Sequence, residues 1–462
     1  MTGAAGGGPA AGGARSGLAA EPLAATLEEL AARGFGEVEA YVKRGRSRRL
    51  VHGPQGQAGS FHSERGWAVR ASTSRASFLA AGSGDVVPGG PWPEPDGRPI
   101  RLPDPGAAGR AAPWSEPPDL ETALIGETEG LRLLAALADA LARELPGARL
   151  LGAVLEDGSS ESRLASSRGV AATARRRVAV LHVEAAYAAQ RGARPAAVAV
   201  DLAEREARRF GPRAVARRLA DRLVAAAAGP PADLGSRDRG EMLLAPPLAA
   251  RLLAALGLWL VGPRAPERLG ALRDRRGRVG SEAVTIVDDG RYPGGALEAP
   301  IDGEGLPTSE VTLVDRGTFR QPLLSWHDLR GAEAGGFRAT GCSRRASWRD
   351  VPRPGPTHLY LDPQRDLSAA DLLADLARGY YLLDATGPVR LDAEADTFTV
   401  PVCGFQVQAG RALAPVAGVR LAGGVGALLR GVQAAARDLA FYPLDGMIGS
   451  PTLLMTGLEL RR

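Results

Sequence analysis

The sequence is poor in cysteine and in long apolar runs. Cys342 and Cys403 are its only cysteines, and two such distant residues do not make a disulfide framework, so we expect both to be reduced and buried. The longest apolar run, residues 252–262, is shorter than the ~20 residues that span a bilayer. The N-terminus has no basic start followed by an apolar segment, unlike a signal peptide. We therefore expect a cytoplasmic protein with no membrane segment.

Lysine and asparagine are almost missing. Lys43 is the one lysine and there is no asparagine, so nearly all of the positive charge is arginine, a bias typical of a GC-rich genome. The net charge of +5 is therefore weak support for a nucleic-acid partner. Such a partner needs arginines clustered with aromatic residues, whereas the densest run, residues 44–49, has only Tyr41 beside it. We expect no nucleic-acid binding and interpret this run as a solvated strand end or loop.

The length of 462 residues predicts roughly two domains, and the content of 45% apolar and 24% charged residues is ordinary for a globular protein. Residues 1–17 are rich in Gly and Ala, and we expect a disordered tail there. Residues 18–240 mix helical and strand periodicity, which predicts an N-terminal mixed α/β domain. The predicted helices start at Pro22, lie around Leu134–Leu141 and span 212–229; the predicted strands are 37–42, 148–155 and 177–184. A Pro/Gly-rich surface excursion is expected at 82–118.

Residues 241–462 differ in character, because short strands and turn signals follow one helix opened by Pro246. Asp315-Arg316-Gly317 and Ala409-Gly410-Arg411 are three-residue hairpin signals with a glycine where positive φ is needed. A short helix is predicted from a Ser368–Asp371 capping pair to Gly379, and a final helix is predicted to carry Leu428 and Leu439. These patterns predict a C-terminal antiparallel β-rich, barrel-like domain with a few helices, and hence an α+β protein.

Several segments, in this order, resemble sequences of the TldD/PmbA family. The most specific are Val284–Gly290, a strand ending in Asp-Asp-Gly, and Ile301–Thr308, which contains an Asp-x-Glu-Gly-x-Pro pattern. The remaining segments are 37–42, 166–170, 340–345, 404–410, 437–439 and 450–454. Each is weak alone, but together they extend over most of the chain from about residue 20. The sequence is therefore identified as a member of this family.

The resemblance also implies where a metal site would lie. In the catalytic members, a helix just after the change of domain carries His-Glu-x-x-x-His, because two histidines one helical turn apart can bind one Zn²⁺ and the glutamate can deprotonate a metal-bound water. The corresponding stretch here, residues 241–253, has no His and no Glu at that spacing, and the last twenty residues lack the Cys that adds a ligand. The chain thus resembles the PmbA/TldE branch, so we expect no catalytic residue, metal ligand or cofactor in it.

Five residues are candidates for a substrate cleft or for a structural role: Asp302, Glu304, Gly305, Arg345 and His327. Asp302 and Glu304 suit acid–base work or a hard cation. We favour a structural role, in which these carboxylates brace a glycine-marked turn by accepting backbone N–H bonds and pairing with Arg344 or Arg345. His327 follows a hairpin strand and can line a cleft. A dispersed zinc site of Cys342, Cys403, His327 and His358 has no supporting spacing, and a Cys–His peptidase lacks an orienting third group.

The expected function is that of a TldE/PmbA-like, non-catalytic subunit of a cytoplasmic TldD–TldE-type metallopeptidase complex. The resemblance implies a TldD-type homologous partner that holds the zinc, and a peptide or unfolded protein as substrate. One alternative is a stand-alone peptidase with a divergent site, which metal analysis would separate from the first reading. The other is a non-enzymatic interaction protein, in line with the family's older description as a gyrase modulator.

Overall fold

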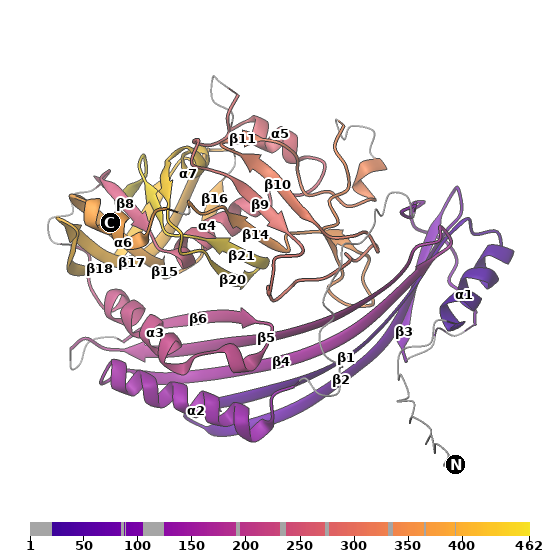
Figure 1. Cartoon of the computed structure of the whole chain (residues 1–462), viewed down its shortest axis with the longest axis horizontal. Coiled ribbons are helices and arrows are strands. Elements are labelled where there is room, and N and C mark those ends of the chain that lie inside the picture. The colour runs from indigo at the N-terminus through magenta and orange to yellow at the C-terminus, as the bar shows by residue number, and fades with distance from the viewer. Residues whose placement is uncertain are drawn as a thin grey trace, which may run out of the picture.

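The computed structural model of the chain describes residues 21–84, 87, 89–104, 124–190, 195–231, 237–272, 277–330, 336–364, 366–392 and 394–462. The tail expected at residues 1–17 and the later part of the excursion expected at 82–118 lie outside these ranges. The described residues form two parts, a long curved sheet with helices and a compact β-rich part, and Figure 1 shows the sheet curling around the second part.

The curved sheet has the strand order β3-β2-β1-β4-β5-β6, and all of its neighbouring strands are antiparallel. Four of these strands are 17 or 18 residues long, against a usual length of about 5–6 residues. Sheets twist, and such long strands accumulate the twist into the half-barrel seen in Figure 1. The bounds are β1 Glu37–Gly53, β2 Gly56–Ser72, β3 Ser77–Ser83, β4 Arg149–Ser166, β5 Ala171–Tyr187 and β6 Ala196–Glu204.

Alternation of side chains gives the two faces of this sheet different neighbours. On the convex face, Leu50, Leu155 and Leu181 pack with apolar residues of α2 (Glu127–Glu144). Helix α1 (Glu21–Ala32) covers the other end of that face, and α3 (Pro212–Ala226), which follows the short η1 (Ala207–Arg209), packs on α2 and on strands of the second part. The concave face is therefore the one turned toward the second part (Figure 1).

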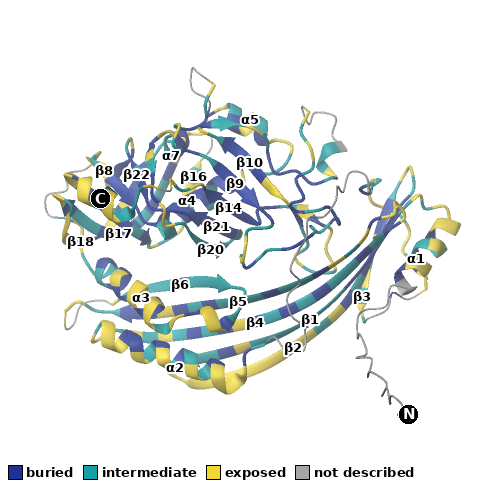
Figure 2. Cartoon of the chain, viewed as in Figure 1, coloured by how far each residue is buried: buried dark blue, intermediate teal, exposed yellow. Residues whose placement is uncertain are grey.

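Two sheets and a central helix build the second part. One sheet has the order β11-β10-β9-β14-β21-β20, the other contains β19-β22-β8-β15-β17-β18-β23-β7 with β16 beside β17, and β12 pairs with β13. Helix α4 (Pro246–Gly257) contacts β14, β20 and β21 of the first sheet and β15 of the second, so it lies between them. Its apolar side chains belong to the largest apolar cluster of the described residues, and Figure 2 draws the ribbons around it mostly in the dark blue of buried residues.

The remaining elements of this part are short, except for the strands β17 and β18 with 12 and 13 residues. The strands are β7 Arg237–Asp238, β8 Glu241–Leu244, β9 Ile286–Asp289, β10 Glu310–Asp315, β11 Thr318–Phe319, β12 Ser343–Arg344, β13 Arg353–Pro354, β14 His358–Leu361, β15 Arg378–Ala385, β16 Arg390–Asp392, β17 Thr397–Gln408, β18 Arg411–Gly423, β19 Val432–Ala435, β20 Ala440–Leu444, β21 Gly446–Ser450, β22 Leu453–Met455 and β23 Glu459–Arg461. The helices are α5 Ala265–Gly270, α6 Ala369–Asp375, α7 Val425–Arg430 and the 3₁₀ turn η2 Asp328–Arg330.

The α+β class is confirmed, and most of the pairing in the second part is antiparallel. Two strand pairs, β14 with β21 and β8 with β15, are parallel instead. No helix in the part of the chain that the structure describes is long and apolar enough to cross a membrane.

Two predicted helix ends are wrong. The capping box of Ser368 and Asp371 is present, but α6 ends at Asp375, and Gly379 lies in β15, where a Cβ would stand 2.1 Å from the Glu241 carbonyl oxygen. Its role is thus close strand packing. The predicted final helix stops at Arg430, because the next residues form β19 and pair with β22. Strand pairing overrides the helical spacing of the leucines there.

The two hairpins form where they were predicted, but each loop has two central residues rather than three. Asp315 pairs with Thr318, and Gln408 pairs with Arg411. Both central residues of each turn have positive φ: 45° and 77° at Arg316 and Gly317, and 47° and 74° at Ala409 and Gly410. This backbone suits the twist of the flanking strands, as in turns of type I′.

Candidate functional site

The turn that carries Asp302 and Glu304 is closed by a bridge between Ile301 and Pro307. Asp302 Oδ1 accepts the backbone N–H groups of Glu304 and Leu306, each at 2.9 Å, and its Oδ2 accepts the N–H of Ser343 at 3.1 Å. Gly305 has φ +84°, and a Cβ there would stand 2.9 Å from a methyl group of Val170, in the turn between β4 and β5 of the curved sheet. The carboxylate thus organises the turn, and the glycine lets the turn approach the sheet.

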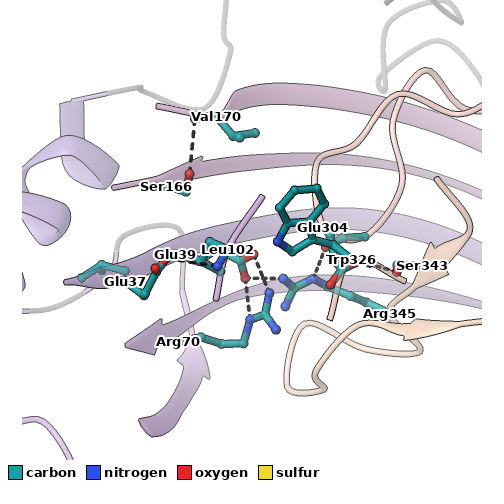
Figure 3. Close-up of polar contacts among 12 residues, drawn as sticks. Glu37, Glu39, Arg70, Leu102, Ser166, Val170, Glu304, Trp326, Ser343 and Arg345 are labelled. Carbon is teal, nitrogen blue, oxygen red and sulfur yellow. Dashed lines mark hydrogen bonds and ion pairs between the residues drawn. The ribbon is translucent and has the colours of Figure 1, made fainter. Parts of the chain in front are cut away.

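A buried ion cluster lies next to this turn (Figure 3). Glu39 of β1 and Arg70 of β2 are directly opposite in the register, and Arg70 binds the carboxylate through two hydrogen bonds of 2.9 and 2.7 Å. Arg345, which follows β12, pairs with the same carboxylate from the other side. The side chains of Glu39, Arg70 and Arg345 are 1%, 8% and 3% exposed. The cluster therefore joins the curved sheet to the second part through desolvated charges.

Glu304 completes the cluster from the turn. Its Oε2 accepts the hydroxyl of Ser343 at 2.7 Å and the backbone N–H of Trp326 at 2.8 Å. Asp302 and Glu304 also interact electrostatically with Arg70. With Glu39, three carboxylates thus face the guanidinium groups of Arg70 and Arg345, and the buried Arg176 also interacts electrostatically with Asp302.

The pKa shifts of Glu39 and Asp302 have opposite directions. Burial opposes ionisation of Glu39, but Arg345 and Arg70 outweigh it and lower the pKa of Glu39 to about 2. Burial and the neighbouring Glu304 raise the pKa of Asp302 to about 7, although three backbone N–H groups act in the opposite direction. Burial therefore favours the neutral form of Asp302, which has no ion pair among the described residues, whereas Glu39 with its two arginine partners favours the ionised form.

The structure corrects the expected partner of Arg345. Its Nε donates to the Gly303 carbonyl oxygen at 3.0 Å, so it does contact the turn, but its carboxylate partner is Glu39. Arg344 pairs with Asp445 instead of either turn carboxylate. Sequence reasoning did not single out Glu39 or Arg70. The signal for them was a charged residue inside a strand that is buried on both faces, because such a residue needs a partner.

A small hollow of about 90 Å³ lies beside the cluster, between the concave face and the second part. Tyr41, Lys43, Ser160, Ser162 and Arg176 line it from the sheet, and Asp302 and Gly303 line it from the turn. The guanidinium of Arg345 lies 4.6 Å from the centre of the Tyr41 ring. Asp302, Gly303 and Arg345 therefore meet at a wall between the two parts, while Glu304 lies behind them.

His327 is not part of this arrangement. Its side chain is exposed, and the adjacent Asp328 bonds to the backbone N–H and the hydroxyl of Ser325. His358 is buried on β14, and burial lowers its pKa to about 4. Its ring bonds to the Asp289 carbonyl and the Leu297 N–H, which is a structural role.

The two cysteines lie in different apolar clusters, Cys342 in the main core and Cys403 beside Ala225 and Ala417. Burial raises the pKa of both thiols, to about 12 for Cys403. Among the described residues there is no group of three or more His, Cys, Asp or Glu side chains that could hold a metal ion. Helix α4 presents Leu, Ala, Pro and Arg side chains only. These residues do not fit a zinc ion.

Comparison with known proteins finds a family model that matches the second part of the chain. Residues 237–462 match the family model of the PmbA/TldA metallopeptidase C-terminal domain. A metalloprotease TldD homologue from Buchnera aphidicola subsp. Schizaphis graminum is 25% identical over 173 residues, which are 37% of this chain and 35% of that protein. The match thus spans about a third of the length of this curated relative.

Two solved structures share the fold over almost the whole chain. TldE from Thermococcus kodakarensis has a TM-score of 0.81 at 17% identity and covers 96% of this chain and 100% of its own. A protein from Thermotoga maritima described as a modulator of a DNA gyrase has a TM-score of 0.74 at 16% identity and covers 95% and 99%. At such identities, the likeness concerns the fold.

Proposed function

The chain belongs to the TldD/PmbA family of metallopeptidase-like proteins, and on this premise we propose that it is the TldE/PmbA-type, non-catalytic subunit of a TldD–TldE-type complex that degrades or processes peptides. In this proposal a TldD-type subunit supplies the zinc and the general base. This chain supplies part of the chamber and binds the peptide.

The composition of α4 carries the proposal. Hydrolysis at zinc needs ligands that converge on one ion and a base beside the metal-bound water. Helix α4 follows the start of the second part, where catalytic relatives are expected to carry His-Glu-x-x-x-His, and its sequence is PPLAARLLAALG. Its face toward the two sheets is packed with leucine and alanine, so the position serves the core. A chain without ligands in that helix can still hold a substrate for a partner that has them.

The concave face offers a place for an extended peptide. Next to the small hollow, this face carries side chains with hydroxyl groups and charged side chains, and loops of the second part border it. Among the described residues, the outer half of β2, Gly56–Glu64, pairs with β1 alone, because β3 begins to pair only at Gly66 and Arg65 accepts the N–H of Gly84. An extended chain can add to such an edge through backbone hydrogen bonds, which confer affinity with little sequence preference.

The experiment is reconstitution with a TldD-type protein from the same genome. Size-exclusion chromatography is run on each chain and on the mixture, followed by a peptidase assay on unfolded casein. The proposal expects one heterodimer peak, proteolysis only in the mixture, and loss of activity with a chelator or after substitution of the partner's glutamate. The isolated chain is expected to hold less than stoichiometric zinc by elemental analysis.

Three results contradict the proposal in different ways. Chelator-resistant proteolysis by this chain alone would show a divergent catalytic site. Separate elution of the two chains at micromolar concentration would remove the heterodimer. Recovery of a topoisomerase, and of no TldD-type protein, in a pull-down would favour an interaction protein over a peptidase subunit.

A further inference from the structure

A second, larger hollow of about 630 Å³ lies against the same loops, within the range of ~300–1,000 Å³ typical of ligand pockets. It is separate from the apolar core, and charged side chains from distant segments line it. Four arginines contribute, namely Arg176, Arg344, Arg345 and Arg353, and two carboxylates, those of Asp350 and Asp445, also line it. Because Glu39 neutralises Arg345 from outside the lining, the hollow keeps a surplus of positive charge.

Two of these arginines are forced together by strand pairing. Arg344 of β12 and Arg353 of β13 are direct partners in the two-stranded antiparallel sheet. Side chains directly opposite each other lie on one face about 4.5–5.5 Å apart at Cβ, and like charges in that position repel. Arg344 has Asp445 as partner at 3.0 Å, but the Asp445 side chain is 72% exposed, so solvent screens this pair. Arg353 is exposed as well, so solvent weakens the repulsion, and an anion between the two arginines would reduce it further.

Arg176 approaches from the curved sheet. It lies on the concave face of β5, and its Nη2 contacts the Ile301 carbonyl oxygen at a long 3.5 Å. No carboxylate among the described residues forms an ion pair with Arg176, and burial lowers its pKa although Tyr41 and Asp302 act in the opposite direction. The desolvated guanidinium thus has only the electrostatic attraction of Asp302 to offset the cost of burial, and an added anion would stabilise it further.

From these three arginines we infer that the hollow is a carboxylate-binding site for an extended peptide, with Arg176, Arg344 and Arg353 as the residues that hold the anion. Arginine suits this ligand, because its planar fork donates two parallel hydrogen bonds to a carboxylate. The inference rests on the proposed function, because it concerns a peptide bound on the concave face and states which group of that peptide the arginines bind. The carboxylate comes either from the end of the peptide or from an acidic side chain.

The glycines around Arg344 fit this role. A Cβ at Gly355 would stand 2.5 Å from Arg344 Nη2, and a Cβ at Gly446 would stand 3.3 Å from its Nη1. Side chains at these two positions would crowd the guanidinium and displace it from the lining of the hollow. The backbone therefore leaves room for Arg344 at the wall of the hollow.

The test measures binding of fluorescently labelled octapeptides to the full chain by anisotropy, with three probes that differ in one feature. The first has a free C-terminal carboxylate and no acidic residue, the second is its C-terminal amide, and the third is the amide with one glutamate. The variants are Arg353→Gln, Arg176→Gln and the matched control Arg420→Gln, an exposed arginine of β18 outside the hollow.

We expect a carboxylate-bearing probe to bind at least about tenfold more tightly than the plain amide, as for a charge-assisted contact. Arg353→Gln and Arg176→Gln should each reduce this ratio severalfold and leave the affinity for the plain amide unchanged. The melting temperature of Arg353→Gln should equal that of the wild type. The control Arg420→Gln should preserve the ratio. Tighter binding of the first probe alone identifies a terminal carboxylate, and tighter binding of the third alone identifies a side chain.

Equal affinity for all three probes, or no binding at millimolar concentration, would overturn the inference. A preference for carboxylate probes that survives when Arg176→Gln and Arg353→Gln are combined in one chain would also overturn it. These results differ from failure of the proposed function, which is judged by heterodimer formation and chelator-sensitive proteolysis. A complex that assembles and cleaves carboxylate and amide peptides equally would keep the proposed function and reject the carboxylate site alone.

Discussion

Replacing Glu39 with glutamine removes the charge that holds the ion cluster together. Glutamine keeps the size of the side chain and one oxygen acceptor, so the change is mainly electrostatic. Arg70 and Arg345 would then lie 8% and 3% exposed without the carboxylate that both bind. Because Arg345 belongs to the second part and Arg70 to the curved sheet, the contact between the two parts should weaken most.

Two arguments give the same magnitude for this change. Lowering the pKa of Glu39 from 4.5 to about 2 corresponds to about 3 kcal/mol at ~1.36 kcal/mol per pKa unit. Removing one partner of a buried ion pair costs ~3–5 kcal/mol in other proteins. We therefore expect Glu39→Gln to lower the free energy of unfolding by about 3 kcal/mol at pH 7.

The pH dependence provides a second readout. A carboxyl group with a depressed folded-state pKa contributes stability that is present above its unfolded pKa of 4.5 and is lost as the pH falls toward 2. The difference between the wild type and Glu39→Gln should therefore be full at pH 7 and should shrink steadily below pH 4.5.

Urea unfolding followed by circular dichroism, at several pH values, measures both quantities. The matched control is Glu156→Gln, which removes an exposed partner of Arg49 on the same sheet and should cost less than ~1 kcal/mol. Limited proteolysis should show faster cleavage between the two parts in Glu39→Gln. A loss no larger than that of the control, or a loss that does not change between pH 7 and pH 3, would refute the reasoning about the cluster.

Two further predictions concern the turn. Asp302 has a folded-state pKa of about 7 and an unfolded value of 3.8, so the stability that its neutral form contributes is lost as the pH rises through this interval. Between pH 5 and pH 8 the decline is at most about 3 kcal/mol, and Asp302→Asn should remove it, as measured by unfolding at these two pH values. A wild type without this decline would contradict the assignment. Gly305→Ala should lower the free energy of unfolding by about 2–3 kcal/mol, because the alanine would have positive φ and would contact Val170. The control Gly457→Ala has positive φ but open space around the Cβ, so it should cost only ~1 kcal/mol. Equal melting temperatures of the two variants would count against the close approach at Gly305.

Local chemistry was readable from the sequence. The positive-φ turns at Arg316-Gly317 and Ala409-Gly410 and the capping box at Ser368 each depend on residues within a few positions of one another. Proline at the start of α3 and α4 likewise needs no distant partner. The order of family-like segments identified the family, and the absence of His and Glu from residues 246–257 was visible before any coordinates.

Contacts between distant segments were decided by the tertiary structure. Glu39 and Arg345 are separated by 306 positions, and nothing in their local sequence assigns them to each other rather than Arg345 to Asp302. The helical spacing of Leu428 and Leu439 was overridden because β22 offers β19 a strand partner. A turn depends on residues that are neighbours in the sequence, whereas the partner of a buried charge can lie at any distance along the chain. Its partner is the opposite charge that the fold buries beside it. For that reason the candidate turn was predictable, whereas the ion cluster and the arginine-lined hollow emerge only when the curved sheet closes on the second part.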